Sequence, residues 1–195
     1  NVERIQSLGE AELELPFKSS GYILMVARFD LRSKDFATII DAYARLDTSI
    51  RDVYKLVLLG DGPDFESVSR SISKGFLEKH IFLPGSTMNP YNWMKNASLL
   101  VHSSKSEGFS LVLLEAMVCG VPIISSNCDV GPSDILADGY FGVLFPVGDV
   151  DALADSIGWV LKNKTECSRL GRLSIQRGIE LTKIGKQQIR AIFND

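Results

Sequence analysis

Short apolar runs alternate with helical patterns along most of this 195-residue chain, and that alternation limits the fold more than any other feature. Consecutive parallel strands need crossover connections, and helical crossovers cover both faces of the resulting sheet. The sequence therefore predicts an α/β fold with a doubly wound, Rossmann-like parallel sheet and C-terminal helices. The predicted strands are residues 22–27, 55–60, 80–83, 98–102, 121–125 and 142–145, and the predicted helices are 36–46, 64–75, 91–95, 111–119, 149–161, 166–178 and 183–193.

Residues 1–20 are more polar than the rest and predict a linker or short helix, which leaves residues 21–195 as one domain. A net charge of −3 argues against a nucleic-acid-binding protein, since phosphate backbones are held by broad basic surfaces. Three cysteines without metal-ligand spacing indicate reduced thiols, no zinc site and a cytoplasmic protein. No run reaches 18 apolar residues and no leader is recognisable, so we expect neither a transmembrane segment nor export.

The stretch 103–120, S-S-K-S-E-G-F-S-L-V-L-L-E-A-M-V-C-G, indicates a loop after a buried strand and then a buried helix. Ser110 stands at the expected N-cap, and Gly108 and Phe109 bring the backbone up to the helix start. Free N–H groups at Ser110–Val112 and the helix dipole favour an anion there. The sequence therefore predicts a phosphate site.

Two glutamates in this stretch lie eight positions apart and can face one crevice. Glu115 lies among apolar residues, where an unpaired charge would cost roughly several kcal/mol. This carboxylate therefore needs a partner. Glu107 lies in the preceding loop. Either both carboxylates serve a ligand, or Glu115 pairs with a buried Arg or Lys and Glu107 is a solvated loop charge.

Two cations follow the first predicted strand, at the edge of the sheet where ligands of such folds bind. They are Arg28 and Lys34, in R-F-D-L-R-S-K. Taken singly, each could be a solvated surface charge, but their shared position at the strand end favours phosphate binding.

Other enzyme classes fit the sequence less well. The turn G-D-G-P at 60–63 lacks the third glycine of a dinucleotide fingerprint, and Asp61 would repel a pyrophosphate. No G-x-S-x-G elbow accompanies His80 or His102, which disfavours a hydrolase triad. Ser103 and Ser104 are predicted to be hydrogen-bonding residues at a strand end.

The E-x7-E arrangement of Glu107 and Glu115 resembles the signature of retaining GT-B glycosyltransferases of the GT4 family. Over essentially the whole chain, further motifs recur in the order of that family: R-x5-K, G-D-G-P, P-G-x-x-x-N-P, G-P-x-[DE]-I-L and P-x-G-D. Ala27 and Asp35 replace the glycines that usually flank the R-x5-K motif, and Asp134 replaces a usual glutamate. The resemblance implies the C-terminal, donor-binding half of a GT-B enzyme.

The resemblance also implies residue roles. Catalytic roles fall to Glu107, Arg28 and Lys34: the cations neutralise the donor diphosphate without a metal, and Glu107 contacts the donor sugar. Glu115 binds the ribose, and the loop at 83–91 either lines the nucleotide base or is a plain turn. The implied donor-binding residues are Glu115, Phe109, Ser110, Leu111, Val112, Gly85 and Ser86.

The implied donor is a nucleoside-diphosphate sugar, UDP- or GDP-linked, with no cofactor. The implied acceptor is a glycan or lipid-linked sugar in surface polysaccharide synthesis, held by an N-terminal domain that we expect to be missing here. The isolated domain would then fold but not transfer sugar, and the full-length enzyme could associate peripherally with a membrane. A GT-B epimerase, a phosphorylase or a non-catalytic nucleotide-sugar-binding module remains an alternative.

Overall fold

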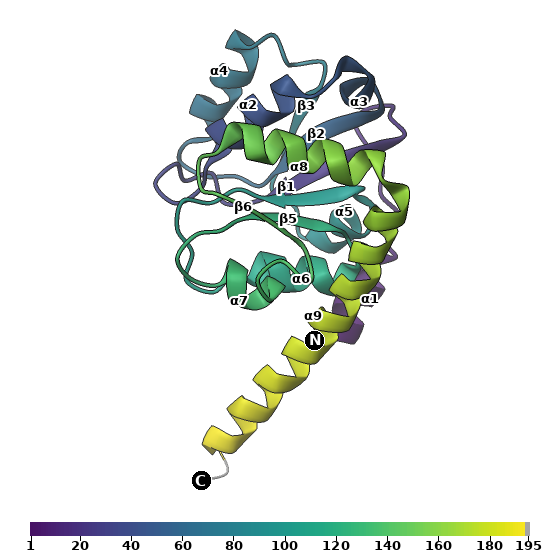
Figure 1. The fold of residues 1–195 in the computed structure, drawn as a ribbon, viewed down its shortest axis with the longest axis vertical. Helices are drawn as coiled ribbons and strands as arrows, with labels where there is room; N and C mark the ends of the chain where they lie inside the picture. The colour runs from purple at the N-terminus through teal and green to yellow at the C-terminus, as the bar shows by residue number, and fades with distance from the viewer. Residues whose placement is uncertain (194–195) are drawn as a thin grey trace.

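Six parallel strands form the centre of the computed structural model, which describes residues 1–193, with side chains through residue 185. Their order across the sheet is β3-β2-β1-β4-β5-β6. The chain builds outward from β1 to β3, returns to the other side of β1, and builds outward again, which confirms the predicted doubly wound sheet (Figure 1). The strands are β1 Gly21–Val26, β2 Tyr54–Leu59, β3 Ile81–Gly85, β4 Leu99–His102, β5 Ile123–Ser126 and β6 Val143–Phe145.

Helices cover both faces of this sheet. On one face α2, α4 and α8 enclose one apolar core, and on the other α5, α6 and α7 enclose a second. Helix α1 packs against α5 and α6, while α9 packs along α6. The helices are α1 Val2–Gly9, α2 Phe36–Arg45, α3 Thr48–Val53, α4 Phe65–Lys74, α5 Pro90–Asn96, α6 Leu111–Cys119, α7 Pro132–Leu136, α8 Val150–Lys162 and α9 Lys164–Phe193.

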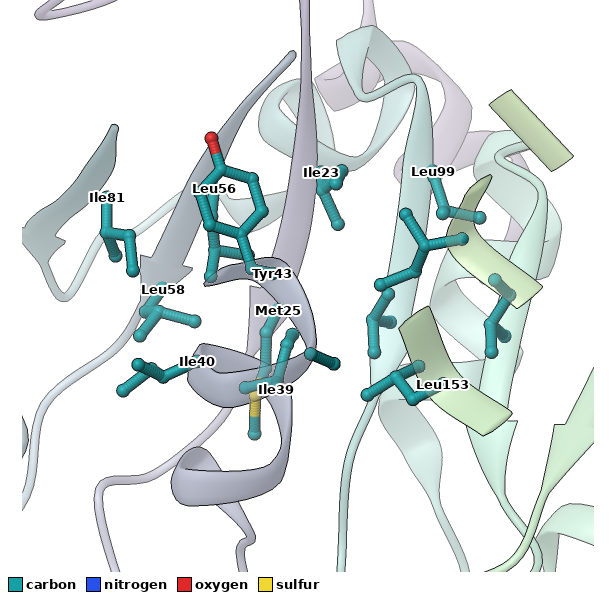
Figure 2. Packing of buried hydrophobic residues seen from close by; sticks show 14 of the residues in the cluster. Ile23, Met25, Ile39, Ile40, Tyr43, Leu56, Leu58, Ile81, Leu99 and Leu153 are labelled. Atoms are coloured by element: carbon teal, nitrogen blue, oxygen red, sulfur yellow. The ribbon is translucent and has the colours of Figure 1, made fainter. Parts of the chain in front are cut away.

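Strand β1 shows why both faces are apolar. Successive side chains of a strand point to opposite sides, so Ile23 and Met25 enter the core beneath α2 while Tyr22 and Leu24 enter the other. Figure 2 shows Tyr43 and its neighbours on α2 packed over β1 and β2. Each fully buried side chain of this size stabilises the fold by roughly 1.5–3 kcal/mol.

The prediction of two terminal helices, 166–178 and 183–193, was wrong, because α9 is a single helix of 30 residues. The expected break falls just after Gly178, where no proline interrupts the chain. A Cβ atom at position 178 would lie 2.9 Å from Met117 Cβ. Gly178 therefore allows α9 to pack closely on α6, and the helix continues through it. Within residues 1–193, no helix is both long and apolar enough to cross a membrane.

Candidate functional site

The loops after β1 and β4 meet at the carboxyl edge of the sheet, where the strand order reverses. Lys34 and Ser104 form an isolated antiparallel bridge between the two loops. Beside it, the N–H of Asp35 donates to the carbonyl of Ser103 at 3.0 Å, and Ser103 Oγ donates to the Asp35 carbonyl at 2.9 Å. The backbone therefore holds the predicted cation loop and the predicted glutamate loop together as one unit.

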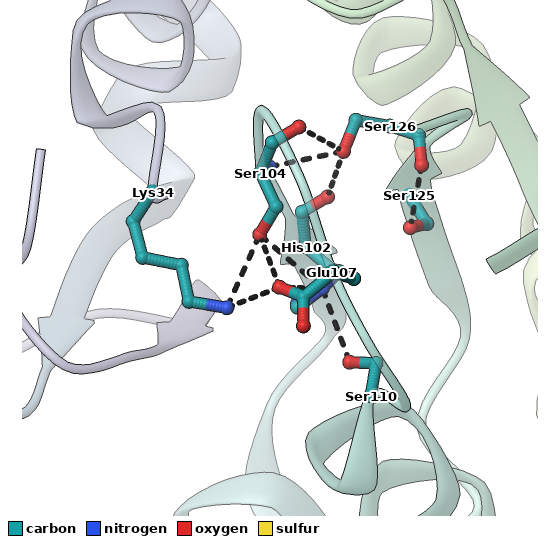
Figure 3. Close-up of polar contacts among 7 residues, drawn as sticks. All are labelled: Lys34, His102, Ser104, Glu107, Ser110, Ser125 and Ser126. Atoms are coloured by element: carbon teal, nitrogen blue, oxygen red, sulfur yellow. Dashed lines mark hydrogen bonds and ion pairs between the residues drawn. The ribbon is translucent and has the colours of Figure 1, made fainter. Parts of the chain in front are cut away.

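Glu107 lies at the centre of a polar network in which three side chains converge on one of its oxygens, Oε1 (Figure 3). Lys34 Nζ forms an ion pair with it, and Ser104 Oγ donates to it at 2.7 Å. His102 Nε2 lies 3.0 Å away. The second oxygen, Oε2, has no partner among the described residues and is not one of the buried polar atoms left unsatisfied. It is therefore free to accept a hydrogen bond from a ligand.

This network keeps Glu107 ionised. Burial alone would raise the pKa of its carboxyl group, but hydrogen bonds from His102, Lys34 and Ser104 outweigh that effect and hold the pKa at about 2. The side chain of Glu107 is only 11% exposed. It is not a solvated loop charge, and it carries a full negative charge at neutral pH.

Arg28 differs from Lys34 although both follow β1. Its side chain is exposed and has no hydrogen-bond or ion-pair partner within the described part of the chain. The nearby Asp30 pairs instead with Arg32 at 2.7 Å. Arg28 is therefore available to an incoming anion, whereas Lys34 is already engaged by Glu107.

A cavity of about 270 Å³ lies between Arg28, the loop after β3 and the start of α6. Ser86 and Val112, both predicted donor-binding residues, line it together with Arg28. Gly85 precedes it with φ +83°, a conformation that favours glycine, and no heavy atom lies within 4 Å of where its Cβ would be. The chain thus brings three predicted site residues to one hollow and leaves the backbone at Gly85 open.

The start of α6 offers unsatisfied donors. Ser110 occupies the N-cap position, but its hydroxyl makes no capping bond and lies 3.1 Å from His102 Nε2. The N–H of Leu111 donates to the Phe109 carbonyl at 3.0 Å, whereas those of Ser110 and Val112 have no acceptor in the described chain. The side chains of Phe109 and Leu111 are 63% and 62% exposed beside them. The helix start remains suited to an anion.

Glu115 has a different environment. It lies one turn beyond Val112 on the same face of α6, and Tyr91 Oη donates to its Oε1 at 3.1 Å. Burial raises the pKa of this carboxyl group, and the Tyr91 bond partly offsets the shift. No Arg or Lys among the described side chains pairs with it, so these residues give no support to the alternative of a buried cation partner.

Sequence reasoning missed two residues of this site, His102 and Tyr91. His102 was considered only as a hydrolase base, although it ends the strand that leads to Glu107. Tyr91 was placed at the end of the loop 83–91 and the start of a short helix, and its contact with Glu115 was missed because a contact between α5 and α6 leaves no signal in spacing. Ser104, in contrast, was predicted as a strand-end hydrogen-bonding residue, and its bonds to Glu107 and to Ser126 Oγ confirm this.

The described residues contain no cluster of three or more His, Cys, Asp or Glu side chains that could hold a metal ion. The three cysteines are free: Cys119 and Cys128 are buried, and Cys167 is half-buried.

Comparison with known proteins gives a family for this arrangement. Residues 12–177 match the model of the family described as glycosyl transferases group 1. An N-acetylgalactosamine-N,N'-diacetylbacillosaminyl-diphospho-undecaprenol 4-alpha-N-acetylgalactosaminyltransferase of Campylobacter jejuni is 30% identical over 163 residues, which cover 84% of this chain and 43% of that protein. A Salmonella typhimurium lipopolysaccharide 1,6-galactosyltransferase is 32% identical over 117 residues, covering 58% of this chain and 33% of that protein. The chain spans less than half the length of these relatives.

Solved structures have the same fold. The crystal structure of Anabaena HepE in complex with UDP has a TM-score of 0.80 and 20% identity, covering 91% of this chain and 50% of that one. TarM of S. aureus has a TM-score of 0.81 and 24% identity, covering 92% of this chain and 36% of that one. At these identities the likeness concerns the fold alone.

Proposed function

This chain belongs to the glycosyl transferases group 1 family, and from that premise we propose that it is the donor-binding domain of a retaining glycosyltransferase that needs no metal. The donor is a nucleoside-diphosphate sugar, UDP- or GDP-linked, bound at the carboxyl edge of the sheet. The observation that carries the proposal is the free Oε2 of the ionised Glu107, beside two cations and the open start of α6. Similar proteins solved in complex with UDP support a uridine nucleotide.

The cations and amides act on the leaving group in this proposal. Arg28, the ammonium of Lys34 and the N–H groups at Ser110–Val112 stabilise the negative charge that grows on the departing diphosphate. Donors fixed in place before the reaction contribute roughly 3–4 kcal/mol each to lowering a barrier. Lys34 can serve both partners, because an ammonium has three donors and Glu107 uses only one of them.

The two glutamates act on the two ends of the donor. Glu107 accepts hydrogen bonds from the sugar hydroxyls and faces the positive charge that develops at the anomeric carbon. Glu115 accepts from the ribose hydroxyls, and each such charged hydrogen bond contributes roughly 1.5–3 kcal/mol. The acceptor hydroxyl attacks on the face from which the diphosphate leaves, which retains the anomeric configuration.

We assign the acceptor to the same class that the relatives' names suggest, a glycan or a lipid-linked sugar, in surface polysaccharide synthesis. In this proposal a second domain holds the acceptor, because transfer needs the attacking hydroxyl within about 3–3.5 Å of the anomeric carbon and therefore a second wall over the crevice. The proposed location is cytoplasmic, with peripheral association at a membrane where a lipid-linked acceptor is used.

A thermal-shift screen with UDP, GDP, uridine and nucleotide sugars tests the donor site, because a ligand of the native state raises its stability by RT ln(1 + [L]/Kd). We expect a diphosphate to raise the melting temperature and uridine to do so much less. Arg28→Gln should shrink that difference, while the control Arg172→Gln, which changes an exposed side chain of α9, should leave it unchanged. Equal shifts for UDP and uridine in the wild type would refute the diphosphate site.

Turnover distinguishes the other activities. Release of free sugar from a bound donor without transfer to any acceptor would favour an epimerase, and donor binding without turnover by the complete protein would favour a binding module.

A further inference from the structure

We propose that His102 is a positioning residue that fixes which oxygen of Glu107 faces the donor sugar. The inference rests on the proposed function and adds to it a residue outside the E-x7-E and R-x5-K motifs. Its basis is the one-sided network: Lys34, Ser104 and His102 all contact Oε1 of Glu107, and none contacts Oε2.

His102 is the rigid member of this network. It ends β4 and is only 1% exposed, so packing fixes the position of its ring. Lys34 is a long, flexible side chain, and a bound diphosphate would compete for its ammonium. Ser104 has a hydroxyl that can rotate. When a donor enters, the His102 contact is therefore the one that changes least.

The chemistry of the contact fixes the proton on the ring. Oε1 of Glu107 lies 3.0 Å from Nε2 of His102, and Ser104 Oγ lies 3.3 Å from the same nitrogen. An ionised carboxylate can only accept hydrogen bonds, so in this proposal the ring hydrogen is assigned to Nε2. Burial lowers the pKa of His102, which favours the neutral ring. Ser110 Oγ lies 3.1 Å from the same nitrogen and links this donor to the start of α6. His102 is thus a neutral Nε2–H donor that joins the sugar end of the site to the phosphate end.

If Oε1 is held by His102, Oε2 stays directed at the sugar. If this contact is lost, the carboxylate can rotate about its last bond, and both oxygens share the remaining donors. Of the groups assigned to the diphosphate and the ribose, only Lys34 contacts Glu107; Arg28, the amides of α6 and Glu115 do not. Loss of His102 should therefore weaken binding of the nucleotide sugar and leave binding of the bare nucleotide almost unchanged.

The test compares four proteins by titration calorimetry: wild type, His102→Gln, His102→Asn and His80→Gln. Gln can place an N–H near the Nε2 position, whereas Asn is too short to reach Glu107. His80 is a matched control, because its Nδ1 lies near Lys55 and the Arg51 carbonyl, away from the Glu107 network. The probes are UDP with UDP-glucose, or GDP with GDP-mannose, whichever pair the wild type binds.

We expect His102→Asn to raise the ratio of the sugar-nucleotide Kd to the nucleotide Kd by about tenfold, the loss of one hydrogen bond to a charged group. In His102→Gln this ratio should lie close to the wild-type value, and in His80→Gln it should equal the wild-type value. If the ratio is the same in all four proteins, or if Asn and Gln behave alike, the inference is overturned while the proposed function stands. If the wild type binds neither UDP nor GDP, the proposed function fails and the inference with it.

Nitrogen NMR of the histidine rings gives a second readout that does not depend on the ligand. A neutral His102 with hydrogen on Nε2 supports the inference. Hydrogen on Nδ1 alone contradicts it, because the ring could then not donate to Glu107.

Discussion

Glu107 and Glu115 are eight positions apart in one motif, yet the fold gives them opposite environments. Glu107 receives three polar side chains, one of them a lysine, and the pKa of its carboxyl group falls to about 2. Glu115 receives only the Tyr91 hydroxyl in the described structure, and burial raises the pKa of its carboxyl group. The contrast arises because one residue lies in the loop between β4 and α6, against the loop after β1, and the other lies on an apolar helix.

In the proposed function, the difference separates two kinds of binding residue. Glu107 is held in place before any ligand arrives, at the cost of keeping Lys34 engaged. Glu115 is under-satisfied until a ligand supplies hydroxyl groups. A preorganised carboxylate suits contact with a developing positive charge, and an under-satisfied one suits a ligand that donates hydrogen bonds. Changes at the first should therefore affect stability, and changes at the second should affect affinity.

The largest effect is expected from Lys34→Met. It leaves Glu107 charged, 11% exposed and without its cation. Breaking a fully buried pair costs about 3–5 kcal/mol, and we expect somewhat less for this part-buried one. Urea denaturation should show this loss in the free energy of unfolding. Arg28→Met is the matched control, because Arg28 is exposed and has no partner in the described residues. The free energy of unfolding of this variant should differ little from that of the wild type.

A double variant sharpens this result. Replacing both partners, as in Lys34→Met with Glu107→Leu, removes the uncompensated charge and should recover much of the lost stability. If Lys34→Met is as stable as the wild type, then the neutral donors His102 and Ser104 suffice to hold Glu107, and the comparison loses its electrostatic basis.

Much of the fold could be predicted because local patterns decide it. Apolar runs with a helix between each pair leave a doubly wound parallel sheet as the consistent solution, and the position of Arg28, Lys34 and Glu107 at strand ends placed them at one edge. The merged helix α9 could not be predicted, because the packing of Gly178 against Met117 is a contact between distant segments.

The site could be predicted as a set of charges but not as a network. Spacing brings Glu107 and Lys34 to the same crevice, yet it does not say that they pair or that His102 and Ser104 share one oxygen. Ser110 shows the same limit. The sequence places it at the N-cap, but the tertiary contact with His102 draws its hydroxyl away from the helix. Side-chain direction depends on competition among partners, which a single sequence does not display.

A smaller effect, on affinity rather than stability, is expected from Glu115→Ala. It should weaken binding of a nucleoside diphosphate by roughly 1.5–3 kcal/mol for each lost ribose contact, measured by calorimetry. Binding of the free base should be unaffected, and the free energy of unfolding should not fall as it does in Lys34→Met. Glu78→Ala, an exposed position before β3, serves as the control. Equal losses for the diphosphate and the base would mean that Glu115 is structural.

The smallest effect is expected from Tyr91→Phe, which removes the one described partner of Glu115 at a contact that water can reach. We expect a stability loss of about 1 kcal/mol or less at neutral pH. The pH dependence is more telling. Burial raises the pKa of Glu115 in the native state above the value of about 4.3 that a glutamate has in the unfolded chain. Between these two pKa values the native state binds more protons than the unfolded chain, so stability falls as the pH rises through this window.

Removing the Tyr91 bond should raise the pKa of Glu115 further and widen this window. Glu107 acts in the opposite direction, because its pKa of about 2 makes its contribution complete above about pH 4.3 and lost as pH falls toward 2. Urea unfolding from about pH 3 to about pH 7 therefore separates the two carboxylates. Tyr91→Phe should change only the fall in the free energy of unfolding above about pH 4.3. In a protein that already carries Glu115→Gln, Tyr91→Phe should leave the pH dependence unchanged. If Tyr91→Phe changes the slope of the unfolding free energy against pH equally in the wild type and in Glu115→Gln, the tyrosine acts through packing. Burial alone would then set the raised pKa of Glu115.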